Sequence, residues 1–465
     1  MRSLLLTLLL FNLACSESGL NQETLNQLNL NSEGQINESA DFVDTAANNI
    51  PLSQNKLLSH CQESGSTNFD PTNLAYLTDP NQQFKYQLNR RYGNHDNDAD
   101  GVVDVDANGD GIGDVDNFRN RRVFDIFYHK GGGKRPLVIH FHGGGFAAGD
   151  KCLSYNYRKM PIKEILNSGG AFMTVNYRLL GYYDNRNQAV VYETNKGLIT
   201  ALKDGKRLIQ FIRSKASTYN IDKNKILVIG ESAGAGIALW NALNDDARDP
   251  KSSSQVARQS SKPNAVMAIG AQATYDFARW ETDIFHQGSN HMFTRWRYAQ
   301  YSVNQNGYFT NYDFPDCNYR NYQNELIDCQ DPQRPLPQAI VDYYNPTSGF
   351  KVALGYSGVG EPAAEPDTPL YQQYLDETEK YRAKVDMLSM FSSDDPVMYI
   401  EELDNPDNVS VPTTGVIFHS KFHAIALNYM ANYFGIKNQL QIGYQRGLDQ
   451  RNLRFKFMNA HILSK

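Results

Sequence analysis

The stretch Ile226–Leu239, ILVIGESAGAGIAL, decides how the chain is expected to fold. Four apolar residues run directly into GESAG at residues 230–234, and residues typical of a helix follow. This order predicts a strand, a sharp turn and a helix, because glycine tolerates the backbone conformations that a tight turn needs. The hydroxyl of Ser232 then projects at the carboxyl end of the strand, where it is a candidate nucleophile. An ordinary glycine-rich turn is the alternative interpretation.

A second glycine-rich turn also follows an apolar run. Leu137–Phe141 (LVIHF) is typical of a buried strand, and it leads into HGGGF at residues 142–146. Glycines at this point let backbone N–H groups approach a reacting carbonyl. We therefore expect Gly144 and Gly145 to form an oxyanion hole with the N–H group of Ala233, which follows the serine. The two turns together are far more specific than either one alone.

Three segments together resemble the α/β-hydrolase carboxylesterases, in the branch of hormone-sensitive-lipase-like, acetylesterase-like and feruloyl-esterase-like enzymes. They are HGGGFAAG at 142–149, VNYRL at 175–179 and IGESAGAG at 229–236. The resemblance implies an α/β fold, with a mostly parallel eight-stranded sheet and helices on both faces. It also implies a catalytic triad in the chain order Ser, Asp, His, with no cofactor in the chemistry.

The resemblance places the acid of the triad after the seventh strand. Val385–Ser392 (VDMLSMFS) is expected to be that strand, and Asp394 and Asp395 follow it. Because the family commonly has its aspartate directly before a proline, Asp395 is the expected acid and Asp394 the competing choice. The acid holds the imidazole of the base in the correct tautomer and stabilises its cation.

The base is expected in the loop between the last strand and the last helix. Gly415–Phe418 (GVIF) is expected to be the strand, and the helix is expected to begin at Ala424. His423 directly precedes this helix and is therefore the expected base. His419 is interpreted as a buried structural histidine.

An acidic segment, residues 94–117, separates two predicted antiparallel strands at Phe84–Tyr92 and Arg122–Tyr128. It contains two copies of one template, in which oxygen-bearing side chains alternate and a glycine permits a sharp turn. The segment resembles thrombospondin type 3 repeats, and a solvated acidic hairpin is the alternative. A structural Ca²⁺ is expected, since this is hard-oxygen chemistry and unneutralised carboxylates repel one another. The expected ligands are Asp96, Asp98, Asp100, Val102, Asp104, Asp106, Asn108, Asp110, Ile112 and Asp114.

The first residues indicate export. Arg2 and the apolar run Leu4–Leu13, too short to span a bilayer, are typical of a signal peptide over residues 1–14. The ending resembles a bacterial lipoprotein signal, which would attach a lipid anchor to Cys15; plain secretion is the alternative. The expected location is the outer membrane or cell surface, or otherwise the periplasm or medium. We expect a polar tether over residues 15–62 and the catalytic domain over residues 63–465.

Four further cysteines, an even number, favour disulfides in an exported protein. Three pairings are compatible with the sequence. The preferred one joins Cys61 to Cys152 and Cys317 to Cys329.

Residues 275–381 form a long, aromatic-rich connection, which predicts a lid or substrate wall; a satellite core is the alternative. Nucleic-acid binding is not expected, because the net charge is −6 and no basic patch is interleaved with aromatics. The sequence therefore predicts a serine carboxylesterase acting on short-chain acyl or aromatic esters, either small or polymer-attached. A peptidase on the same fold and a non-catalytic binding protein remain as alternatives.

Overall fold

The protein is described by a computed structural model, whose described residues all belong to one compact unit, Asn49–Lys465. For residues 181–184 and 189–192 only the backbone is described. The described ranges are 52–62, 69–81, 84–92, 122–129, 131, 133–146, 148–156, 160–179, 181–184, 189–192, 198–276, 279–284, 382–403, 418–443 and 449–464. The predicted signal peptide, the Ca²⁺ segment, most of the predicted lid, Cys317 and Cys329 lie outside them.

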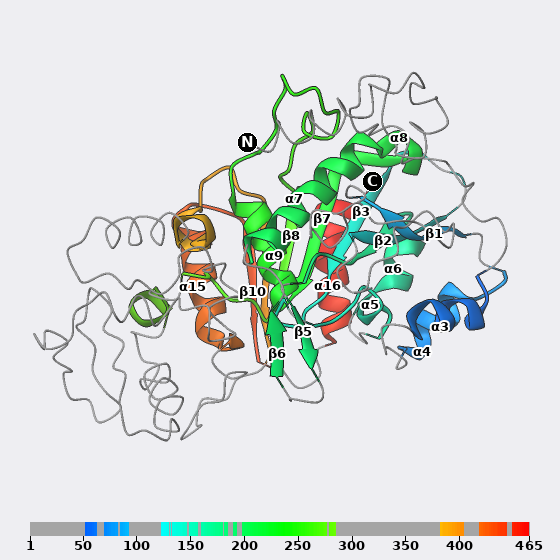
Figure 1. Cartoon of the computed structure of the whole chain (residues 1–465), viewed down its shortest axis with the longest axis horizontal. Coiled ribbons are helices and arrows are strands. Elements are labelled where there is room, and N and C mark those ends of the chain that lie inside the picture. Colours follow the sequence, from blue (N-terminus) through cyan, green and yellow to red (C-terminus); the bar gives the residue numbers. More distant parts are fainter. Residues whose placement is uncertain are drawn as a thin grey trace, which may run out of the picture. The chain divides into compact units, whose positions relative to one another are not determined.

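The centre of this unit is an eight-stranded sheet in the order β1-β2-β4-β3-β7-β8-β9-β10 (Figure 1). Strand β2 runs antiparallel to both of its neighbours, and all other pairs are parallel. The strands are β1 (Phe84–Arg91), β2 (Val123–His129), β3 (Arg135–Phe141), β4 (Ala171–Val175), β7 (Ile221–Glu231), β8 (Ala265–Ile269), β9 (Val397–Glu402) and β10 (Asn438–Ile442), with β5 (Gly181–Asp184) and β6 (Ala189–Tyr192) in a separate pair. The predicted α/β-hydrolase fold is confirmed.

Helices cover both faces of the sheet, which explains why the central strands are apolar on both faces. Every residue of β4 and of β8 is buried. Figure 1 shows α7 and α9 in front of the sheet and α16 behind it. The helices and helical turns are α3 (Gln54–Gln62), α4 (Pro71–Leu77), α5 (Leu153–Asn156), α6 (Ile162–Asn167), α7 (Ile199–Ser214), α8 (Ala216–Tyr219), α9 (Ala233–Leu243), η2 (Trp280–Ile284), η3 (Met387–Ser389), α15 (Lys421–Tyr433), α16 (Gln450–Met458) and η4 (Asn459–Leu463). Within the described ranges, no helix is both long and apolar enough to cross a membrane.

The seventh strand of the sheet lies later in the sequence than predicted. The prediction of a strand at Val385–Ser392 is wrong, because this stretch contains the helical turn η3. The strand is β9, which ends in Glu401 and Glu402, and both of these carboxylates are buried. Glu401 forms a fully buried ion pair with Arg454 of α16, so the charged residue is tolerated inside the sheet.

The eighth strand also differs from the prediction. It is β10, which follows α15 and pairs in parallel with β9. Of the predicted strand Gly415–Phe418, the described part is Phe418, which is not in a strand. Residues 404–417 lie outside the described ranges. The tail after residue 435 therefore contributes a strand and the helix α16 to the fold.

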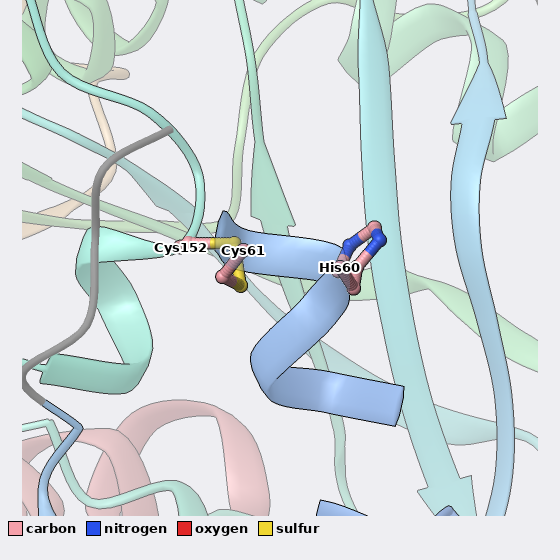
Figure 2. A group of neighbouring side chains, drawn as sticks. All are labelled: His60, Cys61 and Cys152. Carbon is pink, nitrogen blue, oxygen red and sulfur yellow. A yellow bond between two sulfur atoms is a disulfide. The ribbon is translucent and has the colours of Figure 1, made fainter. Parts of the chain in front are cut away.

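The folded part begins earlier than the predicted end of the tether at residue 62. Helix α3 lies within that range, and it contributes Leu57 and Cys61 to the core beside Leu52. The predicted disulfide Cys61–Cys152 is present, with 5.7 Å between the Cα atoms. Figure 2 shows it joining α3 to the segment just before α5. Residues 52–62 are thus held to the sheet both by packing and by a covalent bond.

Candidate active site

Ser232 lies at the apex of the turn between β7 and α9, where the sequence placed it. Its backbone has φ 52° and ψ −118°, a conformation that side-chain-bearing residues rarely adopt. Neither flanking glycine can be replaced without a clash. A Cβ atom on Gly230 would lie 2.0 Å from the carbonyl oxygen of Gly234, and one on Gly234 would lie 2.2 Å from that of Phe141. The tight turn therefore requires both glycines of the GESAG string.

The HGGG segment that follows β3 lies directly against this turn. A Cβ atom on Gly143 would lie 3.3 Å from the Cβ atom of Ser232 and 2.9 Å from the carbonyl oxygen of Glu231. Gly144 and Gly145 follow with positive φ values of 122° and 61° and are exposed. Ala233 is the first residue of α9. The structure thus brings the segment that carries two of the expected oxyanion-hole residues beside the serine and the third.

Aromatic side chains hold this oxyanion loop, residues 142–149, in place. The ring of His142 stacks on Tyr177 at 4.5 Å, and the hydroxyl of Tyr177 donates to the carbonyl oxygen of His142 at 2.8 Å. Phe146 is buried with φ 60°, and its ring meets Tyr275 at 5.5 Å between centroids. Because Phe146 is inserted between buried aromatics, the glycines before it cannot drift away from the serine.

The histidine beside the serine is His419. Its Nε2 atom lies 3.1 Å from Ser232 Oγ, which is hydrogen-bonding distance. The next residue, Ser420, is the N-cap of α15, and its side chain accepts from the backbone N–H group of Phe422. His419 therefore occupies the loop position that was expected for the base.

His423 lies elsewhere, because α15 begins at Lys421 and not at Ala424 as predicted. The side chain is fully buried in the first turn of the helix. Its Nδ1 atom accepts a hydrogen bond from the backbone N–H group of Ala273 at 3.3 Å, and its ring meets Trp280 at 4.5 Å. The structure gives His423 the packed, hydrogen-bonded setting that the sequence interpretation had assigned to His419.

Asp395 lies at the amino-terminal end of β9, whereas Ser232 follows the carboxyl-terminal end of β7. The Oδ1 atom of Asp395 forms a salt bridge with Lys262 at 2.9 Å. Burial raises the pKa of Asp395, while Lys262 opposes this shift. Seven residue steps separate Asp395 from Glu402, which corresponds to roughly 20 Å of extended chain at about 3.3 Å per step. Asp394, the competing choice, has an exposed side chain that also contacts Lys262.

The register of the sheet shows which carboxylate is level with the serine. Glu231 pairs with Ile269 of β8, and Ile269 pairs with Glu401 of β9. Ser232 and Glu402 follow these two glutamates directly. Glu402 is therefore the residue of β9 that lies at the same carboxyl-terminal end of the sheet as Ser232, and it is 3 % exposed.

Gly270 shows that His419 and Glu402 face the same small space. A Cβ atom on this glycine would lie 3.3 Å from Nδ1 of His419 and 3.9 Å from Oε2 of Glu402. The φ of Gly270 is 58°, a further reason for glycine at this position. Nε2 of His419 faces the serine, and Nδ1 is the nitrogen that borders Gly270. Two glutamates at the end of β9 interrupt the apolar pattern, and for this reason the pattern alone does not predict this strand.

A separate buried polar cluster lies beside the disulfide. Among the described residues, His60, Cys61 and Cys152 are the one group with the spacing for a metal ion (Figure 2). Nζ of Lys151 already lies 3.0 Å from Nε2 of His60 and 3.4 Å from Oδ2 of Asp125. The amino group of the buried Lys151 thus occupies this cluster, and the two cysteine sulfurs are bonded to each other. The cluster is better suited to a structural role than to a metal.

Parts of the chain are similar to known proteins. The BD-FAE family model matches residues 124–308, which is less than half of the chain. Among curated proteins, the chain is similar to endo-1,4-beta-xylanase B of Butyrivibrio fibrisolvens, with 28% identity over 142 residues. That alignment covers 30% of this chain and 20% of the relative, so the chain spans about a fifth of the relative's length.

The chain also aligns with two solved structures that are distant in sequence. An acetyl ester-xyloside bifunctional hydrolase from Caldicellulosiruptor lactoaceticus is 16% identical, with a TM-score of 0.39, and the alignment covers 73% of this chain and 88% of that one. A truncated carbohydrate esterase from gut microbiota is 15% identical, with a TM-score of 0.42, and the alignment covers 83% of this chain and 99% of that one. The sheet order and the turn at Ser232, together with the family match, show that the chain has the α/β-hydrolase fold.

Proposed function

We propose that the protein is a serine carboxylesterase that hydrolyses short-chain acyl or aromatic esters through an acyl-enzyme. The carrying observation is the 3.1 Å contact between Ser232 Oγ and Nε2 of His419, at the apex of a strained strand-to-helix turn. A serine hydroxyl is a weak nucleophile until an adjacent base takes its proton. The glycine-rich loop beside the same serine supplies backbone N–H groups near the point of attack.

In the proposed reaction His419 takes the proton of Ser232 as Oγ attacks the ester carbonyl. The N–H groups of Gly144, Gly145 and Ala233 stabilise the oxyanion that forms. His419 then protonates the departing alcohol, and water repeats the cycle on the acyl-enzyme.

Glu402 replaces Asp395 as the proposed acid. Its carboxylate faces the space that Nδ1 of His419 also faces, where it would favour the Nε2-accepting tautomer and stabilise the imidazolium. Likewise His419 replaces His423 as the proposed base. The triad proposed for this chain is therefore Ser232, Glu402 and His419, in the chain order Ser, acid, His.

Two proposals rest on the sequence alone. The first is export through the signal peptide over residues 1–14, with a lipid anchor at Cys15. The second is a structural Ca²⁺ in residues 94–117, the segment between β1 and β2. Chelation is expected to lower the melting temperature while the remaining folded enzyme stays active. An unchanged melting temperature would exclude a Ca²⁺ ion that stabilises the fold.

The decisive experiment is hydrolysis of nitrophenyl esters from acetate to long acyl chains by the wild type and Ser232→Ala. Ser253→Ala, an exposed serine on another loop, is the matched control. We expect Ser232→Ala to lose turnover by a factor on the order of 10⁴ or more, with its melting temperature retained. Labelling by a fluorophosphonate should disappear in Ser232→Ala and persist in Ser253→Ala.

Substantial turnover in folded Ser232→Ala would remove the serine from its role. Cleavage of peptides without ester turnover would favour the peptidase alternative. Inertness of the folded wild type to both esters and fluorophosphonate would favour a binding protein.

A further inference from the structure

We propose that Gln272 is a positioning residue that fixes the catalytic base His419 and couples it to the oxyanion loop. This inference rests on the proposed function. Gln272 lies in the segment that follows β8, and only 2 % of its surface is exposed. It contacts neither the serine nor the imidazole in the hydrogen bonds that the structure gives it, so its effect on the reaction would act through other groups.

On the base side, Gln272 binds the peptide group that carries His419. Its Nε2 atom donates to the carbonyl oxygen of Phe418 at 2.8 Å. The same atom lies 3.3 Å from the carbonyl oxygen of Gly270, the glycine that borders Nδ1 of His419. One buried amide nitrogen thus ties the residue before the base to the glycine beside it, which fixes the position of the His419 backbone.

On the oxyanion side, Gln272 binds an aromatic residue that supports the glycine loop. Its Oε1 atom accepts from the hydroxyl of Tyr275 at 3.2 Å. Burial raises the pKa of Tyr275 well above its usual value, so this hydroxyl stays a neutral donor. The Tyr275 ring packs edge-on against Phe146 of the oxyanion loop. A Cβ atom on Gly236 of α9 would also strike Tyr275, so the ring lies between the helix and the loop.

The chemistry of the position calls for an amide. One end must donate to carbonyl oxygens and the other must accept from a hydroxyl, which glutamine does in a single orientation. A glutamate would turn an oxygen toward two carbonyl oxygens, and a leucine would leave the Phe418 carbonyl and the Tyr275 hydroxyl without this partner.

Other contacts also hold residues 418–423, the base segment, in place. Loss of Gln272 should therefore displace His419 while the segment stays packed. His423 accepts from the N–H group of Ala273, and Trp280 packs against both His423 and Phe418. A displacement of about 1 Å at a catalytic group costs about 100-fold in rate. We therefore expect a folded enzyme with a misplaced base.

The test compares Gln272→Leu and Gln272→Glu with Gln210→Leu. Gln210 is also a buried glutamine that donates to backbone carbonyls, but its partners, Ala247, Ala257 and Gln259, precede the amino end of β8. Loss of kcat by about 100-fold is expected in both Gln272 variants, with KM changed by less than about 3-fold. The pH profile of kcat/KM should also shift on the limb that reports the base. Gln210→Leu should lower the melting temperature and leave kcat and the pH profile unchanged.

Tyr275→Phe is the second, gentler variant, and it keeps the test decisive if the Gln272 variants do not fold. It removes only the hydroxyl that Gln272 accepts from, and we expect kcat to fall by about 3- to 10-fold with the same shift of the pH profile. Folded Gln272 variants that keep wild-type kcat and pH profile would overturn the inference, and so would an unaffected Tyr275→Phe. Failure of the proposed function would appear separately, as turnover by Ser232→Ala.

Discussion

The nucleophile side and the base side of the site are held in different ways. Ser232 and the oxyanion loop are fixed by tight backbone turns in which glycine is required, and both follow central strands of the sheet. His419 comes from a segment 187 positions away in the sequence, and single side-chain contacts hold that segment against the end of β8. The first arrangement is local and rigid, and the second depends on a few long-range hydrogen bonds.

This difference has a consequence for how the enzyme should respond to substitution. On the nucleophile side, changing a glycine forces backbone atoms together, so the turn itself is lost. On the base side, changing one polar side chain leaves the helix α15 and its packing in place but displaces the imidazole. Effects on kcat without loss of folding should therefore concentrate on the base side.

The largest expected effect distinguishes His419 from His423. His419→Ala should lower kcat by a factor on the order of 10⁴ or more, because it removes the imidazole that lies within hydrogen-bonding distance of Ser232 Oγ. Its melting temperature should stay near that of the wild type. His423→Ala should instead lower stability by about 1–3 kcal/mol, since it removes the acceptor for Ala273 N–H from a buried site.

Steady-state kinetics and thermal unfolding of the two variants check this assignment. Retained turnover in His419→Ala, together with abolished turnover in a folded His423→Ala, would show that His423 and not His419 is the general base. It would also contradict the idea that the loop position, and not the helix, carries the chemistry.

A second comparison concerns the two ends of β9. Glu402→Gln keeps the size of the side chain and removes the charge that would stabilise the imidazolium, so kcat should fall by about 10²- to 10⁴-fold. Asp395→Asn loses the salt bridge with Lys262 at the opposite edge of the sheet. It should lower the melting temperature, because the buried Asp395 side chain loses the charge that pairs with Lys262. It should leave kcat within about 2-fold, because Asp395 precedes β9 and lies away from the serine.

The matched pair makes this test sharp, since both variants convert one buried carboxylate into its amide. A folded Glu402→Gln with wild-type kcat would exclude Glu402 as the acid and direct the search to residues 404–417. A large loss of kcat in a folded Asp395→Asn would contradict the assignment of the acid to Glu402, which was made from the register of the sheet.

The parts of the site that the sequence predicted are those encoded by local geometry. GESAG and HGGG require glycine because of backbone contacts within a few residues, and each follows an apolar run, so both turns were located correctly. The disulfide Cys61–Cys152 was the preferred pairing and is confirmed.

The base and the acid depended on element boundaries, which local patterns define poorly. Helix α15 begins three residues before the predicted start, so the loop position expected for the base is occupied by His419 and not by His423. Ser420 as an N-cap was the signal that could have corrected it. For the acid, the charged residues Glu401 and Glu402 hide the end of β9 from a search for apolar strands. Glu401 can be buried there because it forms an ion pair with Arg454, which is distant in the sequence.

A third comparison concerns the nucleophile side, where little effect on catalysis is expected. Cys152 follows the oxyanion loop by three residues, and its disulfide ties that stretch to α3. Removing a native disulfide commonly costs about 2–5 kcal/mol of stability. The double variant Cys61→Ser/Cys152→Ser should therefore unfold at a lower temperature, yet kcat well below that temperature should stay within about 3-fold.

The reason is that the loop has other attachments besides the disulfide. The side chain of Asn176 accepts from the backbone N–H group of Lys151 and donates to Asp150, and Phe146 stays packed against Tyr275. Thermal unfolding and nitrophenyl acetate kinetics on the same samples separate the two effects. A large loss of kcat in the folded double variant would show that the covalent bond, and not the backbone turn, positions the oxyanion loop. The two sides of the site would then both depend on long-range contacts.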